Sequence, residues 1–288
     1  MDGRKILARA FELAASPAVY PVLERVADAH VPPVLRSPIY RSLAWLGGID
    51  LDEMQGRPED YASLSAFFVR RLLPDARPID PDPAAVVSPA DGELQGVGTF
   101  GPGDDPVVPV KGASLALGRA LGDRRAAIAG GGHYFVVYLS PRNYHRVHAP
   151  LAGRVRSWQS VPGTRLPVNR LGFRACPEVL SANERAVIEL ETEEGTRFFL
   201  VLVAAYGVAR TGLAFADPGE VRRRSGGPAV ELDPPVPFAR GAEIGAFNLG
   251  STAICIWPAA RNPVVWLRCA GPIRMGQAVA RRTVDGET

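Results

Sequence analysis

Short runs of β-branched and aromatic residues, each closed by turn residues, constrain the fold of this chain more than any other feature. Runs of this kind predict strands. They lie at residues 134–140, 154–161, 186–192, 197–209, 252–258 and 263–269. The main helical pattern among them is residues 110–123, whereas an alternating α/β sheet needs a helix between most strands. We therefore expect an α+β, β-rich fold whose main part is a barrel or a sandwich.

The beginning of the chain follows a different pattern. Apolar residues recur at three- and four-residue steps over residues 4–26, which predicts one or two amphipathic helices broken near Pro17 or Pro21. A short third helix is expected at residues 40–48, where Trp45 contributes to an aromatic, amphipathic face. A face of this kind either beds at a lipid interface or packs on the protein's own core, and the pattern alone fits both.

A further helix and a linker follow. Residues 60–73 predict a helix with Asp60 or Ser63 as its cap and Pro74 as its stop. Residues 74–83 carry four prolines, and each proline biases the preceding residue away from the helical region. We therefore expect an extended linker here, and two parts: a helical region over residues 1–75 and a β-rich domain over residues 76–288.

Charge and cysteine content limit the partners of the chain. The formal net charge is +3, from 33 Lys and Arg against 30 Asp and Glu, which suits an anionic membrane surface but lacks the dense basic stripes of nucleic-acid binding. Three cysteines without a CxxC pair favour a reducing compartment. We expect no secretory signal, because charges are scattered through residues 1–16 and no small-residue cleavage site follows a clean apolar core. We expect no transmembrane helix, because no charge-free run reaches about 20 apolar residues.

The segment at 247–258, FNLGSTAICIWP, places Ser251 between Gly250 and Thr252 in a run without charge. Small residues between strands are mostly turns or tight packing. The segment also lacks the G-x-S-x-G spacing of a nucleophile elbow, since Leu249 and Ala253 stand where glycines are required. Ser251 therefore does not by itself predict a hydrolase.

Two other segments carry residues suited to chemistry. Asp91 lies in a Pro-Ala-Asp-Gly turn, where a carboxylate often caps its own backbone. His145 and His148 lie in PRNYHRVHAP, residues 141–150, whose flanking prolines disfavour the helix of a His-x-x-His zinc site. No metal site is expected, and two structural histidines are a fair alternative reading.

Asp91, His148 and Ser251 also form a set of residue types that can activate a serine. In such a set a carboxylate fixes the imidazole tautomer, the imidazole takes a proton, and the hydroxyl attacks. The three residues are far apart in the sequence, so this reading depends on the fold bringing them together.

Taken together, these stretches resemble the prokaryotic phosphatidylserine decarboxylases, which are pyruvoyl-dependent and membrane-associated. Similar segments run through most of the chain in the expected order. They are residues 52–80, 86–94, 110–112, 139–153, 182–185 and 237–254. Departures at Asn143, at residues 181–182 and at residues 204–209 touch substrate-facing or packing positions.

The resemblance implies that the chain cleaves itself between Gly250 and Ser251. Ser251 attacks the carbonyl carbon of Gly250, the peptide bond becomes an ester, and elimination leaves a pyruvoyl group at residue 251. A residue without Cβ suits the close approach that this attack demands. Leu249 and Thr252 complete the motif, and a large chain and a small chain result.

The same resemblance assigns the remaining roles. His148 is the base that activates Ser251, and Asp91 orients it. The pyruvoyl cofactor forms a Schiff base with the amine of phosphatidylserine and takes up the electrons freed when CO2 leaves, giving phosphatidylethanolamine. His145 then protonates the carbanion, although chemistry alone accepts either histidine.

The implied partners are phosphatidylserine, an anionic membrane surface, the chain's own two fragments and a second copy in a homodimer, with no nucleic acid. The implied location is the cytoplasmic side of the cell membrane, as a peripheral protein. Three alternatives stay open: a serine hydrolase acting on an acyl lipid through Asp91, His148 and Ser251, a decarboxylase of a related serine-headed lipid, and a non-catalytic lipid-binding relative.

Overall fold

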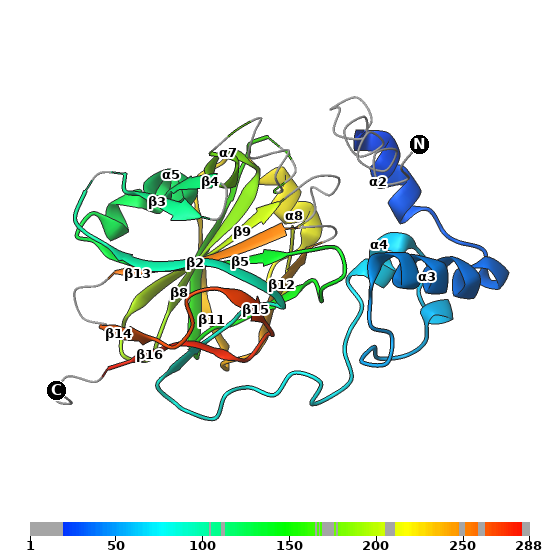
Figure 1. Cartoon of the computed structure of the whole chain (residues 1–288). Coiled ribbons are helices and arrows are strands. Elements are labelled where there is room, and N and C mark those ends of the chain that lie inside the picture. Colours follow the sequence, from blue (N-terminus) through cyan, green and yellow to red (C-terminus); the bar gives the residue numbers. More distant parts are fainter. Residues whose placement is uncertain are drawn as a thin grey trace.

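The chain folds into a small helical part and a large β part, joined by a long segment without helix or strand (Figure 1). The computed structural model describes residues 20–103, 105–110, 113–164, 166, 168, 176, 178–204, 211–247, 251–258 and 263–283. The expected β-rich fold with N-terminal helices is confirmed.

The helical part packs around its own small core. Its elements are α2 (Tyr20–Asp28), α3 (Pro33–Gly47), the 3-10 helix η1 (Pro58–Asp60) and α4 (Leu64–Phe68). Tyr40, Ala44, Met54 and Phe67 are buried together, and the rings of Tyr40 and Phe67 stack with centroids 4.7 Å apart. α3 ends at Gly47 and is capped by Gly48, whose φ of 68° is a left-handed conformation that glycine adopts without strain.

The expected helices are present but their lengths differ from the sequence pattern. The expected short helix at residues 40–48 is the second half of the longer α3. The helix expected at residues 60–73 is wrong in its second half, because α4 ends at Phe68 and residues 71–73 pair instead with residues 53–55. Ser63 is its cap and accepts a hydrogen bond from the Ala66 amide at 3.2 Å. Most of the helical pattern expected over residues 4–26 lies outside the described residues.

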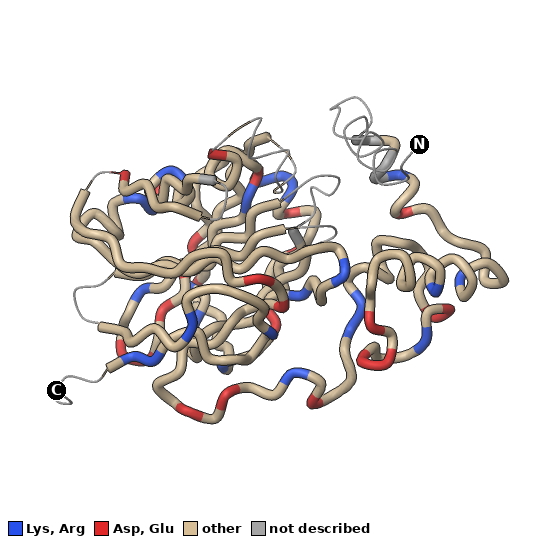
Figure 2. Tube along the Cα trace, in the orientation of Figure 1, with Lys and Arg blue, Asp and Glu red and all other residues tan. Residues whose placement is uncertain are grey.

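The proline-rich segment at residues 74–83 forms neither helix nor strand, as expected for a linker. It leaves the helical part and runs along the edge of the β part to β1 (Figure 1). Charges of both signs line this segment and the junction between the two parts (Figure 2).

The β part is built on an eight-stranded antiparallel sheet. Its strands, in order across the sheet, are β11 (Val230–Phe238), β7 (Gly153–Val161), β8 (Arg185–Glu191), β9 (Arg197–Ala204), β13 (Ser251–Pro258), β5 (Gly132–Leu139), β2 (Gly92–Phe100) and β15 (Gly271–Ile273). Alternate residues of β13 enter two different cores, with Ala253 and Cys255 in one and Ile254 and Ile256 in the other. The central strands are therefore buried on both faces, which explains their uninterrupted apolar runs.

Smaller sheets and short helices complete the sandwich-like architecture. The sheets are β1 (Ala85–Val87) with β16 (Ala278–Arg282) and β14 (Val264–Trp266), β6 (Arg146–His148) with β12 (Glu243–Phe247) and β10 (Thr211–Leu213), and β3 (Val107–Val110) with β4 (Ala113–Ala116). The helices are α5 (Leu117–Leu121), η2 (Gly122–Ile128), α7 (Val179–Ala182) and α8 (Pro218–Arg223).

The helix expected at residues 110–123 is wrong in its first part. β4 forms there because β3 supplies a pairing partner, with Val108 opposite the buried Leu115. A helix begins only at Leu117. Among the described helices, none has the length and apolar character needed to cross a bilayer.

Candidate active site

Ser251 is the first residue of β13, in the middle of the main sheet. It lies opposite Leu139 of β5 on one side and Ala204 of β9 on the other. Its side chain is fully buried, and within the described residues neither its Oγ nor the Oγ1 of Thr252 has a hydrogen-bond partner. A buried hydroxyl without a partner costs about 1–3 kcal/mol, so it calls for a functional explanation. Leu249 and Gly250 lie outside the described residues.

A tight loop leads from the residue opposite Ser251 to the two histidines. The Oδ1 of Asn143 accepts hydrogen bonds from the backbone N of Ser140 at 2.9 Å and from its Oγ at 2.6 Å. This loop ends at His145, whose carbonyl accepts a hydrogen bond from the Phe247 amide at 2.9 Å. The end of β5 and the end of β12, which precedes Ser251, therefore both connect to His145.

His145 is fully buried and holds an unused nitrogen. Its Nδ1 is 2.8 Å from the carbonyl oxygen of Asn143, so this nitrogen carries the proton. Its Nε2 has no hydrogen-bond partner among the described residues, and its ring centroid is 4.1 Å from that of Phe68. Burial lowers the pKa of His145 to about 3. The imidazole is therefore neutral at pH 7, with a free lone pair at Nε2.

His148 is also buried, but both of its nitrogens are bonded. Its Nδ1 donates to the carbonyl oxygen of Gly241 at 2.8 Å, which leaves Nε2 as the acceptor for the Tyr144 hydroxyl at 3.1 Å. Burial is the main cause that lowers the pKa of His148, and burial raises the pKa of Tyr144 to about 12. At neutral pH a protonated phenol therefore donates to a neutral imidazole.

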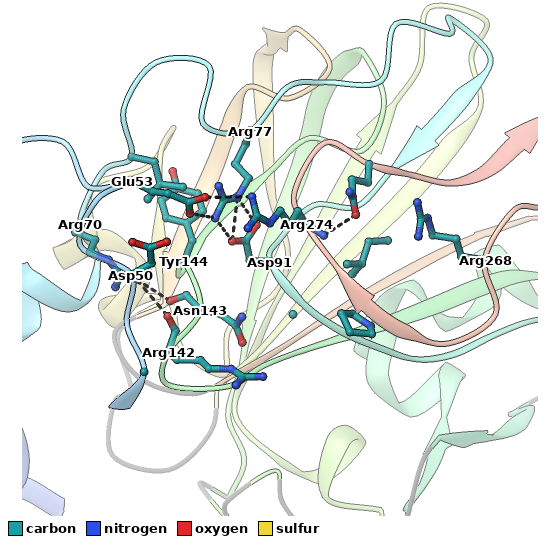
Figure 3. A pocket seen from close by; sticks show the side chains of 16 residues that line it. Asp50, Glu53, Arg70, Arg77, Asp91, Arg142, Asn143, Tyr144, Arg268 and Arg274 are labelled. Atoms are coloured by element: carbon teal, nitrogen blue, oxygen red, sulfur yellow. Dashed lines mark hydrogen bonds and ion pairs between the residues drawn. The ribbon is translucent and has the colours of Figure 1, made fainter. Parts of the chain in front are cut away.

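Asp91 lies in the turn before β2, next to β6. The amide of His148 donates to the Pro89 carbonyl at 2.8 Å, which ties this turn to the strand that carries His148. The Asp91 carboxylate itself is bound by Arg77, with Nε at 2.8 Å from Oδ1 and Nη2 at 2.6 Å from Oδ2, and by the Met275 amide at 2.9 Å (Figure 3). Both side chains of the Arg77–Asp91 pair are only 7% exposed.

The structure thus brings the turn of Asp91 and the strand of His148 together, but their side chains form no hydrogen bond or ion pair with each other in the described residues. In the described part of the chain, the carbonyl of Gly241 and not the Asp91 carboxylate fixes the His148 tautomer. Asp91 acts on the imidazole through space, where its charge opposes the effect of burial on the His148 pKa. The roles expected for Asp91, His148, His145 and Ser251 stay predictions.

Three functional candidates were missed at the level of sequence. Tyr144 precedes His145 directly and could have been found by its position in the motif. Arg77 gave no signal, because it stands in a proline-rich linker without periodicity. Glu53 belongs to the helical part and accepts hydrogen bonds from Arg77 at 2.7 Å and Arg274 at 3.1 Å.

The arrangement suits proton transfer and attack by a hydroxyl. It offers two neutral imidazoles, a protonated phenol and an unbonded serine in surroundings from which water is excluded. No group of three His, Cys, Asp or Glu side chains placed to hold a metal ion occurs in the described ranges.

Comparison with known proteins identifies the family. The model of the phosphatidylserine decarboxylase family matches residues 64–281. A phosphatidylserine decarboxylase proenzyme of Azotobacter vinelandii is 40% identical over 271 residues, covering 90% of this chain and 92% of the relative. The proenzyme of Bordetella pertussis is 38% identical over 268 residues, covering 90% and 88%, and that of Pseudomonas fluorescens is 37% identical over 244 residues, covering 80% and 83%. This chain belongs to the phosphatidylserine decarboxylase family.

Proposed function

We propose that this chain decarboxylates phosphatidylserine to phosphatidylethanolamine and CO2, after it has converted Ser251 into a pyruvoyl group. Family membership supports the reaction, and the relatives' name, proenzyme, supports a precursor that is processed. The observation that carries the proposal is the fully buried Ser251 hydroxyl, which has no hydrogen-bond partner in the described structure.

The first task of the site is self-cleavage. The Oγ of Ser251 attacks the carbonyl carbon of residue 250, and its proton must pass to a base. His148 serves as that base, because its Nε2 carries a lone pair. The hydroxyl of Tyr144 occupies this lone pair at 3.1 Å, so Tyr144 either relays the proton or turns aside. The negative charge of Asp91 favours the protonated His148 that results.

The surroundings of Ser251 fit a pyruvoyl group. Its strand neighbours Leu139 and Ala204 are buried and apolar, which limits hydrolysis of a reactive carbonyl. The pyruvoyl group supplies an electron sink for the carboxyl carbon, as a pyridoxal cofactor does elsewhere.

In the decarboxylation step, His145 accepts a proton and then donates it. Because its pKa is lowered to about 3, its Nε2 is unprotonated at pH 7 and cannot donate until it has collected a proton. We propose that Nε2 takes a proton from the substrate ammonium and returns it to the carbon that loses CO2. The missing hydrogen-bond partner at Nε2 leaves this nitrogen available for both transfers.

Peripheral attachment to an anionic membrane on its cytoplasmic side completes the proposal, with the processed enzyme acting as a homodimer. Exposed apolar side chains gather on α2 and α3 and suit an interfacial helix. They are Val22, Val26, Val34, Leu35, Ile39, Leu43, Trp45 and Leu46. The most exposed are Trp45 at 83% and Val34 at 82%.

A denaturing gel and an intact-mass measurement test the proposal. We expect two chains, residues 1–250 and 251–288, with the small chain lighter by one ammonia than the same fragment beginning with serine. Ser251→Ala should give one chain and no CO2 from vesicles containing carboxyl-labelled phosphatidylserine. Ser160→Ala, a buried serine in β7, is the matched control and should cleave normally. A single uncleaved chain that releases CO2 contradicts the proposal.

A further inference from the structure

A cavity of about 410 Å³ lies where the helical part, the linker, the histidine loop and the C-terminal strands meet (Figure 3). Its lining is dominated by charged side chains. Five are arginines, Arg70, Arg77, Arg142, Arg268 and Arg274, against three carboxylates, Asp50, Glu53 and Asp91. The lining therefore carries a formal surplus of two positive charges.

Two of the arginines are neutralised within the cavity wall. Arg77 lies 2.6 Å from the Asp91 carboxylate and 2.7 Å from that of Glu53. Arg274 lies 3.1 Å from the other oxygen of Glu53. The carboxylates of Asp91 and Glu53 are thus engaged, and the positive surplus belongs to the remaining arginines.

Arg70 is a buried cation without a carboxylate partner among the described residues. The residue is 3% exposed, and its Nη2 donates to the carbonyl oxygens of Arg142 at 3.2 Å and Asn143 at 3.4 Å. Its Nε and Nη1 are buried without a hydrogen-bond partner in the described structure. A buried charge with unused donors is costly unless a counter-ion binds. Arg70 therefore points to an anion.

Arg142 and Arg268 bring two further cations to the same cavity. Both are exposed, and neither guanidinium has a hydrogen bond or ion pair within the described ranges. The guanidinium fork matches the oxygens of a phosphate group, and several guanidiniums around one space are typical of phosphate recognition. The positive surplus disfavours a metal cation, because like charges repel.

The cavity also adjoins the candidate active site. Tyr144 lines it and donates to His148, while Asn143 lines it and accepts from His145. Each site histidine is therefore hydrogen-bonded to a residue that lines the cavity. A cavity of this volume admits a polar headgroup.

We propose that this arginine-lined cavity binds a phosphate-type oxyanion, which in the proposed function is the phosphodiester of the lipid headgroup. The identification with the lipid rests on the proposed function, whereas the anion site itself does not. The carbonyl contacts of Arg70 tie the site to the loop that carries His145.

Titration calorimetry on the full-length Ser251→Ala chain tests the anion site, because binding then needs no self-cleavage. Sodium phosphate and glycerophosphoserine, the water-soluble headgroup, are titrated at constant low ionic strength. We expect saturable binding of both, weakened at least tenfold in Arg142→Gln/Arg268→Gln. The control Arg125→Gln/Arg222→Gln removes the same charge from exposed positions outside the cavity and should bind normally. No saturable binding, or equal binding by both double variants, overturns the proposal.

The two ligands also separate the sources of the anion. Glycerophosphoserine binding at least tenfold tighter than phosphate supports the lipid headgroup. Phosphate binding as tightly as glycerophosphoserine overturns the lipid assignment and keeps the anion site. Arg70→Lys retains a charge but loses the fork, and we expect it to weaken binding while urea unfolding confirms that the variant is folded. If wild-type protein releases no CO2 while these anions bind, the proposed function fails and the anion site stands.

Discussion

Replacing Arg77 by methionine tests the energetic role of the ion pair that holds Asp91. The pair is nearly inaccessible to solvent, and Arg77 also binds Glu53. Burial opposes the charge on Arg77, but the hydrogen bonds to Asp91 and Glu53 outweigh it and raise the Arg77 pKa. The variant leaves the Asp91 carboxylate with the Met275 amide as its remaining hydrogen-bond donor among the described residues.

The expected loss of stability follows from this burial. Removing one partner of a buried ion pair costs about 3–5 kcal/mol, because the other charge stays desolvated. An exposed pair of similar length is worth only about 0.2–1 kcal/mol. The control is Arg119→Met, which breaks a pair with Glu178 at 2.7 Å whose side chains are 54% and 44% exposed. Arg77→Lys should fall between wild type and Arg77→Met, since one ammonium replaces a fork.

Urea unfolding in the Ser251→Ala background measures these free energies on a single uncleaved chain. The reasoning is refuted if Arg77→Met costs less than about 1 kcal/mol, or no more than Arg119→Met. In that case the pair at Asp91 is energetically equivalent to a surface pair.

Three further predictions address the site and the membrane face. Between pH 7 and 4.5, the free energy of unfolding of His145→Gln should fall by about 2–3 kcal/mol less than that of the protein with His145, measured by urea unfolding. His145 protonates near pH 6.5 in the unfolded chain and only near 3 in the folded chain, so the stability that the neutral imidazole contributes is lost as the pH falls. Parallel curves of unfolding free energy against pH for the two proteins contradict this. Tyr144→Phe should slow self-cleavage at least about tenfold on timed gels if Tyr144 relays the Ser251 proton, because the variant lacks the hydroxyl that passes it to His148; an unchanged or faster rate contradicts the relay and shows that the hydroxyl only occupies the His148 lone pair. Trp45→Ser/Leu46→Ser should weaken flotation with anionic vesicles at least about tenfold, since each large apolar side chain buried is worth about 1.5–3 kcal/mol; the control Val265→Ser, 52% exposed on β14, should float as wild type does.

The main strands could be predicted from sequence because of how they are buried. β5, β8, β9 and β13 are covered on both faces, so they contain apolar runs that are easy to recognise, although the buried Glu189 interrupts the run of β8. β11 was missed, because its segment VELDPPVPF contains three prolines. It is an edge strand of the main sheet, where a missing amide hydrogen is tolerated.

The helix expected over residues 60–73 is an element that the local sequence predicts incorrectly in part. Its local pattern is helical, yet Leu72 forms a bridge with Met54 and the Leu73 amide donates to the Glu53 carbonyl. This pairing is a contact between distant segments, and such contacts override local propensity. The periodicity of residues 60–73 gives no sign of this pairing.

Some residues of the candidate site could be named from the sequence and others could not. His145, His148 and Ser251 became candidates because their segments, taken together and in order, resemble those of a known family, and their roles stay predictions. The partner of Asp91 was not predicted, because Arg77 reaches it only after the linker folds back over the β part. Side chains that meet through long-range folding leave no signature in the local sequence.

The interior position of β13 determines how a processed enzyme would hold together and refold. This strand is hydrogen-bonded along its length to β5 and over most of its length to β9, and the chain beyond it adds β14, β15 and β16. A fragment beginning at Ser251 would stay in place as an integral strand of the sheet, without any covalent tie. Refolding after full denaturation would then require two molecules to meet, so recovery of the enzyme would depend on protein concentration.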